Sequence, residues 1–380
     1  MGKIDELIQQ YCPEGVEWKK IEEVCKVKTP PAKLKTSDYQ EQGLFLIIDQ
    51  GQQQYAGYTD NEKAVVEDGE YILYGDHTCI VKYHKGRFAQ GADGLKILVS
   101  KANNSKYVYY AFSAYNLTST EYKRHWTQAK EIEIPLPPLP VQEAIVNILD
   151  RFAVYAAELQ AELQERQQQY NYYRDTLLSF EGRDDVQWKK LGEVAEIGDG
   201  LHGTPHYSKN TGYYFINGNN LHNGIIEYDI NTKQISKEEY GRIKFDLNEN
   251  TLLMSINGTI GNIAYYNGEK IALGKSAAFF KVNPNHLFKK FLYYYLQSAQ
   301  AHHYYELVQT GSTIKNLGLK SLREMKIPVP SLTEQERIAS ILDRFDTLVN
   351  DLAQGLPAEI EARRQQYEYY RDKLLTFKRK

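Results

Sequence analysis

The stretch ILDRF occurs twice in the chain, at Ile148–Phe152 and again at Ile341–Phe345. The same spacing relates Ile134-Pro135 to Ile327-Pro328, so each copy follows a matched, proline-containing lead-in. Matches that keep their order over a fixed spacing indicate an internal repeat. The chain is therefore predicted to contain one structural unit twice.

The repeat extends through a tyrosine-rich stretch and a tryptophan-containing stretch. QQQYNYYRDTLLSF at 167–180 matches RQQYEYYRDKLLTF at 364–377, and VEWKKIEEV at 16–24 matches VQWKKLGEV at 186–194. The N-terminal residues thus match the segment that follows the first tyrosine-rich stretch, so they continue the second repeat. The repeated segments, here called connectors, alternate with two regions that differ in sequence, here called variable regions, as if the chain were circular. The second connector holds four extra residues near Gly355, so the predicted pseudo-two-fold symmetry is not exact.

The tyrosine-rich stretches carry the spacing of a coiled coil. Their apolar and aromatic residues recur at the a and d positions of paired helices, and an arginine fills the remaining seam position in each copy. We expect two helices per connector, with a capping box at Thr333 and Glu336 and a helix boundary at Gly355 and Pro357. The seam residues, expected to pack, to set spacing and to dock partners, are Leu159, Leu163, Arg166, Tyr170, Tyr173, Leu177, Leu356, Ile360, Arg363, Tyr367, Tyr370 and Leu374.

The repeat divides the chain into five predicted segments. The expected fold class is α/β (α+β), with two variable domains separated by long antiparallel coiled-coil helices. The segments are 1–24, which completes the distal connector; 25–133, the first variable domain; 134–194, the central helical connector; 195–326, the second variable domain; and 327–380, the C-terminal helical connector.

Both variable domains show short β-type runs separated by polar loops. The runs are LFLII, EYILY and LKILV in the first domain, and GYYFIN, TLLMSI and SAAFFKV in the second. The second domain ends with FLYYYLQSAQAHHYYEL, whose length and apolar recurrence predict one buried helix, and YVYYAFSAYNL is the expected equivalent in the first.

The loops of both domains combine Gln, Asn, His, Ser, Thr and Lys with Gly and Tyr. Amide side chains can pair bidentately with adenine, whereas Lys and Arg reach guanine or phosphate. Each loop taken alone is equally typical of simple turns, but six such loops in two matched domains favour DNA binding. The candidate DNA-binding residues are Gln50, Gln52, Gln53, Tyr55, His77, Thr78, Lys82, His84, His202, Thr204, Asn217, Asn219, Asn220, Asn257, Ser312, Thr313 and Lys315.

The charge of the chain permits nucleic-acid binding without demonstrating it. The formal net charge is −3, but residues 25–133 carry 14 Lys and Arg against 13 Asp and Glu, and residues 195–326 carry 14 against 11. The variable domains are thus slightly basic and the connectors acidic. A chance division of solvated charges would explain differences this small equally well.

Cysteine usage and hydropathy favour a cytoplasmic location. Only Cys12, Cys25 and Cys79 are present, without a CxxC pair, which argues against a secreted disulfide framework and against a zinc site. The N-terminal residues lack the apolar core that a signal peptide has. No run approaches the roughly 18 apolar residues that a membrane helix needs. We therefore expect no contact with a membrane.

No catalytic constellation is visible in the sequence. The motifs GxxxxGK[ST] and GxGxxG are absent, and no tetrapeptide typical of amino-methyl transfer occurs. His202 and His206 have the helical i, i+4 spacing of metal ligands, but Gly203 and Pro205 would break such a helix. We predict no catalytic residue, no metal site and no cofactor bound by this chain.

Several of these stretches closely resemble the specificity subunits of Type I restriction-modification systems. The resemblance rests on PLPPLPVQEAIVNILDRF, VPSLTEQERIASILDRF and GLPAEIEARRQQYEYYRDKLLTF in the connectors, and on YGDHT and FAQGADGLKIL in the first variable domain. It covers essentially the whole chain and is strongest in the connectors.

The resemblance implies a non-catalytic, sequence-specific DNA-binding subunit. The variable domains would be target-recognition domains that each read one half of a split, asymmetric double-stranded DNA site. The connectors would set their spacing and dock two methyltransferase subunits, which bring S-adenosylmethionine and methylate adenine after flipping it from the stack. Restriction subunits that translocate and cut DNA would join with ATP and magnesium.

Two other classes of function stay open. A pure interaction protein would bind protein through its coiled coil and paired domains, and weak salt dependence of duplex binding would favour it. A stand-alone nuclease would use a site that the sequence does not reveal, and a metal-dependent cleavage assay on the isolated chain would detect it.

Overall fold

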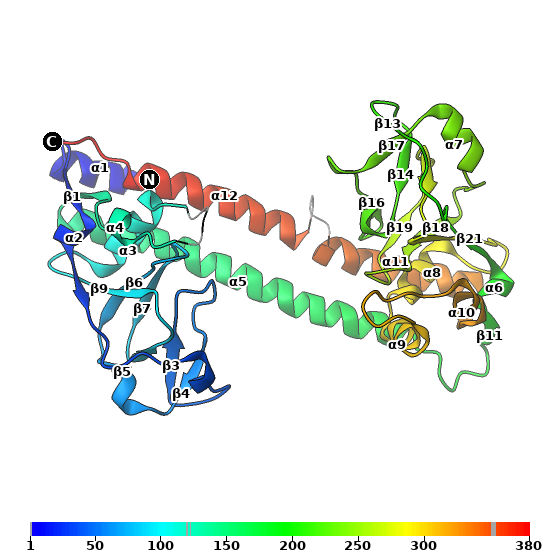
Figure 1. The fold of residues 1–380 in the computed structure, drawn as a ribbon, viewed down its shortest axis with the longest axis horizontal. Helices are drawn as coiled ribbons and strands as arrows, with labels where there is room; N and C mark the ends of the chain where they lie inside the picture. The colour runs from blue at the N-terminus through cyan, green and yellow to red at the C-terminus, as the bar shows by residue number, and fades with distance from the viewer. Residues whose placement is uncertain (1, 119–120, 122, 351–354) are drawn as a thin grey trace. The chain divides into compact units, whose positions relative to one another are not determined.

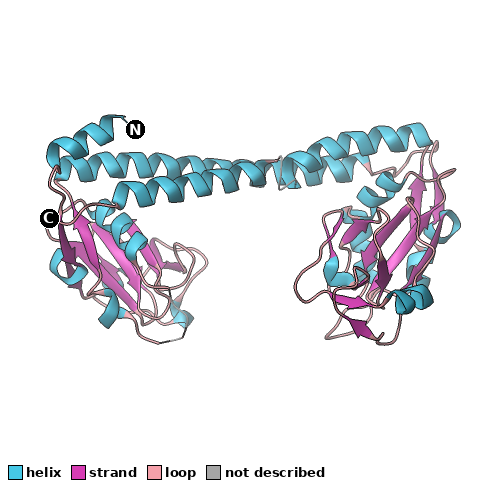
Figure 2. Cartoon of the chain, turned by 90° about the horizontal axis from the view of Figure 1, so that it is seen from above, coloured by secondary structure: helices cyan, strands magenta, loops and turns pink. Residues whose placement is uncertain are grey.

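The computed structural model describes residues 2–118, 121, 123–350 and 355–380. The chain forms two compact units: unit 1 comprises residues 1–158 with 360–380, and unit 2 comprises residues 159–359. Each unit combines a β-rich domain with helices, as Figures 1 and 2 show. The predicted mixed α/β fold class is confirmed.

The β-rich domain of unit 1 contains two four-stranded sheets. Its strands are β2 (Cys25–Lys28), β3 (Phe45–Ile48), β4 (Gly57–Thr59), β5 (Val65–Val66), β6 (Glu70–Gly75), β7 (Val81–Lys85), β8 (Phe88–Gln90) and β9 (Leu95–Ser100). One sheet has the order β2-β9-β6-β7 and is antiparallel, and the other has the order β4-β3-β8-β5. Within the second sheet β3 and β8 run parallel. Short helical turns η1 (Thr36–Asp38) and η2 (Glu62–Ala64) lie between strands.

The β-rich domain of unit 2 also contains two four-stranded sheets, with the orders β12-β21-β18-β19 and β13-β17-β14-β20, and it adds the two-stranded sheet β15-β16. Its strands are β12 (Ala195–Asp199), β13 (Tyr207–Ser208), β14 (Tyr214–Ile216), β15 (Leu221–His222), β16 (Ile225–Ile226), β17 (Lys233–Ile235), β18 (Thr251–Ser255), β19 (Ile263–Tyr265), β20 (Ile271–Leu273) and β21 (Ala277–Val282), with η3 (Gly218–Asn220) and α7 (Lys237–Ile243) between them. The antiparallel sheet β12-β21-β18-β19 corresponds to β2-β9-β6-β7 of unit 1. The parallel pair β14 and β20 corresponds to β3 and β8.

The sequence predicted these strands well and one helix poorly. All six runs expected as strands form strands, namely β3, β6 and β9 in unit 1 and β14, β18 and β21 in unit 2. The expected single helix of the second domain is instead two helices, α8 (Lys289–Leu296) and α9 (Ala299–Val308). The chain breaks there because Ser298 starts a new helix, its Oγ accepting a hydrogen bond from the Ala301 N–H at 3.2 Å. The equivalent of α8 in unit 1 is α3 (Ser105–Tyr115), as expected.

The two connectors differ in their helices. The central connector is one continuous helix, α5 (Leu139–Leu177), which contradicts the expected two helices. The second connector has α11 (Leu332–Asn350) and α12 (Leu356–Leu375), separated by residues that include 351–354, outside the described part of the chain. The difference follows from sequence, because residues 141–177 contain neither Gly nor Pro, the residues that most disfavour helix.

The predicted capping box at Thr333 is wrong. Thr333 lies inside α11, and the cap is Ser331, whose Oγ accepts a hydrogen bond from the Glu334 N–H at 3.3 Å. The predicted boundary at Gly355 is confirmed, since α12 begins at Leu356 with Pro357 in its first turn.

Matched aromatic stacks pair the connector helices within each unit. In unit 1 the Phe152 ring stacks on Tyr370 with ring centroids 5.4 Å apart and an interplanar angle of 29°. In unit 2 the Phe345 ring stacks on Tyr173 at 5.4 Å and 28°. The phenylalanine of each ILDRF therefore contacts the tyrosine-rich stretch of the other connector.

The chain ends close the circle that the sequence repeat implied. The Val16 N–H donates to the Lys378 carbonyl at 2.9 Å, and the Lys380 N–H donates to the Val16 carbonyl at 3.1 Å. The N-terminal segment forms α1 (Gly2–Tyr11), β1 (Glu17–Lys20) and α2 (Ile21–Val24), and the matched segment of unit 2 forms β11 (Gln187–Lys190) and α6 (Leu191–Val194).

The lead-ins to the two ILDRF copies pair with the tryptophan-containing stretches. β1 pairs with β10 (Glu133–Leu136), and β11 pairs with β22 (Lys326–Val329), both antiparallel. The register is the same in both pairs, with Trp18 opposite Pro135 and Trp188 opposite Pro328. α4 (Trp126–Ala129) and α10 (Leu319–Glu324) precede β10 and β22.

A carboxylate clamp joins each β-rich domain to its connector helix. In unit 1 Asp150 accepts hydrogen bonds from Lys106 Nζ at 2.7 Å and from Tyr110 Oη at 2.6 Å. In unit 2 Asp343 accepts them from Lys290 Nζ at 2.5 Å and from Tyr294 Oη at 2.6 Å. Asp150 and Asp343 are the aspartates of the two ILDRF copies, so the repeated motif makes the same contact twice.

A buried glutamine repeats beside each clamp. Gln142 Oε1 accepts a hydrogen bond from the Asn104 N–H at 3.0 Å, and Gln335 Oε1 accepts one from the Phe288 N–H at 2.7 Å. Both Nε2 atoms donate to a proline carbonyl in the lead-in at 2.8 Å. These bonds hold the starts of α3 and α8 against the connectors.

Replacing the clamp carboxylate should loosen one unit and leave the other unchanged. Asp150→Asn removes the charge that pairs with Lys106 and weakens the bond to Tyr110, so we expect α3 to lose about 1–3 kcal/mol of local stability. Asp343→Asn should do the same to α8. Hydrogen exchange followed by mass spectrometry on peptides of both helices measures this.

Asp68→Asn is the matched control, because Asp68 is exposed in a loop of unit 1. It should change exchange in neither helix. Unchanged protection of α3 in Asp150→Asn would show that the clamp does not hold the domain.

Candidate nucleic-acid interface

The polar loops of unit 1 meet at one end of its sheets. Strands β3, β6 and β8 end there and β9 begins there, so the loops 49–56, 76–80 and 91–94 come together. The Gly91 N–H donates to the Ile48 carbonyl at 2.9 Å and ties two of these loops to the parallel strand pair. Seven of the eight candidates in unit 1 lie on or beside this cluster.

Gln50 and Thr78 are bonded within the loop cluster. Gln50 Oε1 accepts from the His77 N–H at 3.0 Å, and Gln50 Nε2 donates to the Asp93 carbonyl at 3.1 Å. Thr78 Oγ1 donates to the Gln50 carbonyl at 2.7 Å. These side chains connect the loops, so they shape the surface that the loops present.

Lys82 is an interior lysine. Its side chain is 4% exposed, and Nζ donates to the carbonyls of Asp49 at 2.9 Å and Gln53 at 2.5 Å. Burial lowers the pKa of Lys82, and the nearby Asp49 carboxylate partly opposes that shift. The buried ammonium group therefore holds loop 49–56 in place through two of its backbone carbonyls.

His84 is the candidate that the fold separates from the others. It lies opposite Tyr71 in the β6–β7 pairing, away from the end where β6 terminates. Its ring packs edge-on against Phe88 with centroids 5.0 Å apart. Burial lowers its pKa, so the ring is neutral near pH 7.

Gln52, Gln53 and Tyr55 are the exposed candidates of loop 49–56. The Tyr55 side chain is 46% exposed and packs beside Tyr58 with ring centroids 5.9 Å apart. All three residues are exposed and therefore accessible to a nucleic acid.

The loops of unit 2 converge at the corresponding end. Loop 217–220 follows β14, loop 274–276 follows β20, loop 256–262 joins β18 to β19, and loop 200–206 follows β12. The Leu201 N–H donates to the Leu273 carbonyl at 2.7 Å, and the Gly258 N–H donates to the Lys315 carbonyl at 2.9 Å. All nine candidates of unit 2 lie in these loops or in loop 310–316.

Three asparagines of unit 2 are bonded within the cluster. Asn217 Oδ1 accepts from Ser276 Oγ at 3.1 Å, and Asn257 Nδ2 donates to Asn316 Oδ1 at 3.2 Å. Asn220 is buried, and its Nδ2 donates to the Glu227 carbonyl at 3.1 Å. Like Gln50 in unit 1, these amides fix the loops.

The remaining candidates of unit 2 are exposed. His202 Nε2 lies within hydrogen-bonding distance of Asp199 Oδ2, at 2.7 Å, and the His202 side chain is 72% exposed. The others are Thr204, Asn219, Ser312, Thr313 and Lys315.

Sequence reasoning missed two cations near these loops. Lys275 is exposed in loop 274–276, between the strands that carry the other loops. Arg124 is exposed beside His125, whose N–H donates to Asp76 Oδ1 at 3.0 Å and so reaches loop 76–80. Neither lies in a Gly- and amide-rich stretch, and only their position in the fold identifies them.

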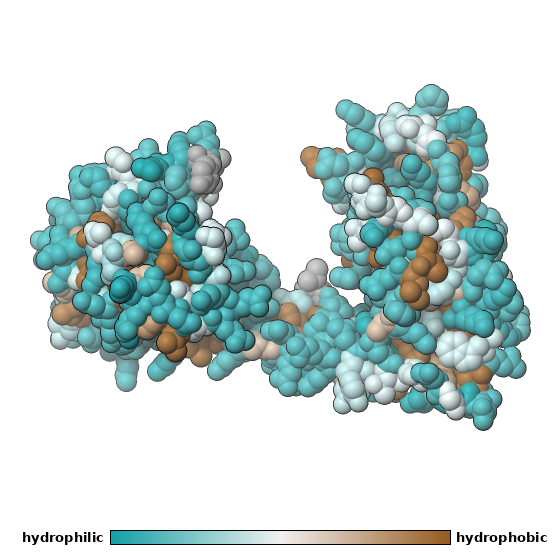
Figure 3. Space-filling model, turned by 60° about the horizontal axis from the view of Figure 1, so that its bottom comes forward, coloured by the Kyte–Doolittle hydropathy of each residue, from teal (hydrophilic) through white to brown (hydrophobic). Residues whose placement is uncertain are grey.

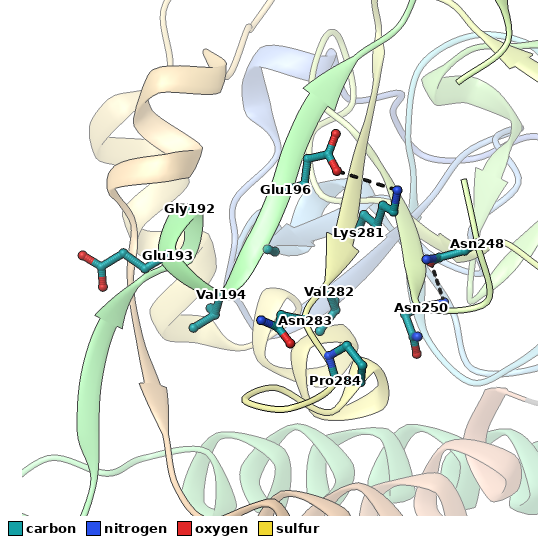
Figure 4. A pocket seen from close by; sticks show the side chains of 11 residues that line it. Gly192, Glu193, Val194, Glu196, Asn248, Asn250, Lys281, Val282, Asn283 and Pro284 are labelled. Carbon is teal, nitrogen blue, oxygen red and sulfur yellow. Dashed lines mark hydrogen bonds and ion pairs between the residues drawn. The ribbon is translucent and has the colours of Figure 1, made fainter. Parts of the chain in front are cut away.

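A polar hollow of about 570 Å³ lies in unit 2 and is lined by Glu196, Lys281 and Asn283 among others. Figure 4 shows Glu196 and Lys281 as an ion pair at its rim. It is formed where β12 starts and β21 ends, at the opposite end of the sheet from the loop cluster. It is therefore separate from the candidate interface.

The seam residues of the connectors are used for packing in several places. Tyr170 and Leu374 are buried, Leu159 is 7% exposed, and Tyr173 and Tyr370 form the aromatic stacks. Arg166 bonds Gln169 on its own helix, and Arg363 lies over the Tyr155 ring. Leu163, Leu177 and Tyr367 pack against the cores, and Leu356 and Ile360 are partly buried.

In the described part of the chain, no group of three His, Cys, Asp or Glu side chains could hold a metal ion. No helix among the described residues is long and apolar enough to span a bilayer.

The sequence matches a family model described as the Type I restriction modification DNA specificity domain over residues 13–166 and again over 183–362. The chain is 34% identical over 388 residues to the Type I restriction enzyme EcoR124I/EcoR124II specificity subunit of Escherichia coli, covering 95% of this chain and 94% of that protein.

Two solved structures have a similar fold. One is the S subunit of a Type-I restriction-modification system from M. genitalium, with a TM-score of 0.58 and 17% identity over 95% of this chain and 96% of that one. The other comes from work on complex assembly and conformational transition of the type I R-M system, with a TM-score of 0.61 and 17% identity over 96% and 98%.

Gln50 and Gln52 should behave differently when each is replaced by alanine. Gln50→Ala leaves the His77 N–H and the Asp93 carbonyl without their partner, so we expect amide exchange in 76–80 to accelerate about tenfold or more. Gln52→Ala removes an exposed side chain and should leave that exchange unchanged. Equal effects of the two variants would contradict the structural assignment of Gln50.

Proposed function

The chain belongs to the Type I restriction modification DNA specificity family, and from this premise we propose which parts of it read DNA and which bind other subunits. It is a recognition subunit and not an enzyme. Residues 25–133 read one half of a bipartite, asymmetric duplex site, and residues 195–326 read the other half. The connectors, 134–194 and 327–380 completed by 1–24, set the spacing between the halves.

This proposal rests on one observation: the two domains share their strand framework, but their loops differ in sequence. Both domains have the same strand order in their antiparallel sheet, the same parallel strand pair in their second sheet and the same carboxylate clamp. Their loops differ in sequence and meet at the same end of the sheets. Two different sets of loops on the same strand framework are suited to a DNA site whose two halves differ in sequence.

Exposure within the loop clusters divides the candidates into two roles. The exposed polar side chains contact base edges in the major groove, where all four base pairs can be distinguished. Lys275, Lys315 and Arg124 contact phosphates and fix the register. The internally bonded residues, including Gln50, Lys82 and Asn220, hold the loops in the shape that fits the groove.

The proposed partners are double-stranded DNA, two methyltransferase subunits and restriction subunits. The methyltransferase subunits supply S-adenosylmethionine and flip the target adenine before methylating it. The restriction subunits supply ATP- and magnesium-dependent translocation and cleavage. This chain determines which DNA sequence the assembly recognises.

Selection from a random duplex pool tests the main proposal. The chain is co-expressed with its methyltransferase partner, and bound DNA is sequenced. We expect a gapped motif with two defined halves and a fixed spacer. If an intact complex enriches no sequence, the chain is a protein-binding scaffold instead.

Exchanging one reader tests the modular arrangement. When residues 25–133 are replaced by the same segment of a relative, one half of the motif should change and the other should stay. A change in both halves would refute the assignment of one domain to one half-site.

Single substitutions separate base contacts from phosphate contacts. Gln52→Ala should relax the preference at one position of one half-site by about 1–3 kcal/mol. Lys275→Ala should weaken binding to all sequences alike and lower the dependence of log K on log salt by about one. A sequence-dependent effect of Lys275→Ala would assign it to base reading.

A further inference from the structure

The tryptophan of the repeated VxWKK segment is covered in unit 1 and open in unit 2. Trp188 is 40% exposed and borders a hollow of about 450 Å³ beside α9. We propose that this hollow binds a short acidic peptide segment of another protein, with one apolar side chain as its anchor. None of the residues that line the hollow belongs to the loop cluster of unit 2. The hollow is therefore separate from the candidate DNA interface.

In unit 1 the C-terminal segment of the chain covers the matched residue, Trp18. The Arg379 guanidinium lies over the Trp18 ring, 4.7 Å from the ring centroid, and its Nη2 donates to Glu133 Oε2 at 2.5 Å. The Tyr115 ring packs edge-on against Trp18 with ring centroids 5.3 Å apart. A peptide segment and an aromatic side chain thus cover this tryptophan in unit 1.

Neither covering side chain has a counterpart at the matched position of unit 2. The spacing that aligns the two tyrosine-rich stretches places Gly182 at the position of Arg379. The alignment of the clamp helices α3 and α8 places Ala299 at the position of Tyr115. Glycine and alanine are too small to cover an indole ring. Unit 2 has therefore kept the tryptophan, whereas the residues that cover it in unit 1 are replaced by small ones.

One wall of the hollow is apolar and comes from several elements. Its apolar and aromatic lining residues are Trp188 of β11, Tyr295 of α8, Tyr304 and Leu307 of α9, and Met325, which precedes β22. Leu307 is 70% exposed, and Tyr304 is held in place because its Oη donates to the Ser321 carbonyl at 2.8 Å. Exposed apolar side chains that gather in one place mark binding sites, and tryptophan and tyrosine are frequent anchors there.

Figure 3 brings forward the side of unit 2 on which α9 lies in Figure 1. Side chains of intermediate and high hydropathy gather there among hydrophilic ones. This surface can therefore offer an apolar contact to a ligand from solvent.

The charge beside the tryptophan is reversed between the units. The pairing of β1 with β10 places Lys20 opposite Glu133, whereas the matched pairing of β11 with β22 places Lys190 opposite Lys326. Lys190 forms an ion pair with Glu324 at 2.5 Å, but Lys326 has no ion pair with any residue that the structure describes. Like charges directly opposite each other on a sheet repel. A carboxylate placed beside Lys326 is therefore favoured.

These features define the occupant. An apolar side chain covers Trp188 and contacts Leu307, and a carboxylate close to it in sequence pairs with Lys326. An extended peptide carries both groups within a few residues, and a peptide segment already makes the matched contact in unit 1. The C-terminal segment of a second copy of this chain fits less well, because its last three residues are basic and would meet Lys326.

Fluorescence anisotropy with labelled peptides tests the site on the full chain. The probe LTFEEE has the sequence of residues 375–380, LTFKRK, with the three basic residues replaced by glutamate. We expect LTFEEE to bind. The peptide LTFKRK lacks the carboxylates and the peptide ATAEEE lacks the apolar anchors, so each should bind at least about tenfold more weakly. If LTFEEE does not bind the wild-type chain, or if LTFKRK binds more tightly, the proposal is wrong.

Variants of the chain locate the bound peptide. Trp188→Ala and Leu307→Ala should each weaken LTFEEE binding at least about fivefold. Lys326→Glu should reverse the preference, so that LTFKRK binds more tightly than LTFEEE.

Lys237→Glu is the matched control, because it makes the same change of charge at an exposed position of α7 that does not line the hollow. It should leave the binding of all three peptides unchanged. If none of the three variants in the hollow alters LTFEEE binding, the peptide binds elsewhere and the proposal is refuted. Circular dichroism of each variant identifies any loss of binding that comes from unfolding.

Discussion

One half-buried carboxylate in each unit determines how a recognition domain sits on its helix. Asp150 accepts hydrogen bonds from a lysine and a tyrosine of α3, and Asp343 accepts the equivalent two from α8. Burial and the carboxylate together raise the pKa of Tyr110 and of Tyr294, so both hydroxyls remain donors. A donor left without this carboxylate would be desolvated and unpaired, which is costly. ILDRF is repeated because this contact is needed twice.

The sequence predicted the repeat, the strands and the location of the loops, but not how individual polar side chains are used. Gln50 and Gln52 are the same residue type in the same loop. Gln50 is bonded to His77, which is 27 residues away in sequence, whereas Gln52 is exposed. Local sequence carries no information on which distant backbone group an amide will reach. The same limit applies to Lys82 and Asn220.

Two glycines at the base of the loop clusters show how the loops can differ while the strand framework stays the same. Gly91 and Gly274 follow the equivalent strands β8 and β20. A Cβ would lie 2.2 Å from Tyr39 Oη at Gly91 and 2.2 Å from Asn217 Oδ1 at Gly274. The glycine is kept while the side chain packed against it differs. Close packing at the base of each loop cluster therefore fixes the loops in place and leaves their outer residues free to vary.

Symmetry and asymmetry occupy different surfaces of the chain, and this division follows from what each surface meets. A DNA site with two unlike halves requires unlike loops, and the loop clusters have diverged. The contacts that join each domain to its connector helix are the same in both units, and the residues that make them, the ILDRF aspartates and the buried glutamines, have been kept. Duplication alone would make every surface drift alike. The residues that stay matched include those with a hydrogen-bonding or stacking partner in both units, whereas the loop sequences have changed.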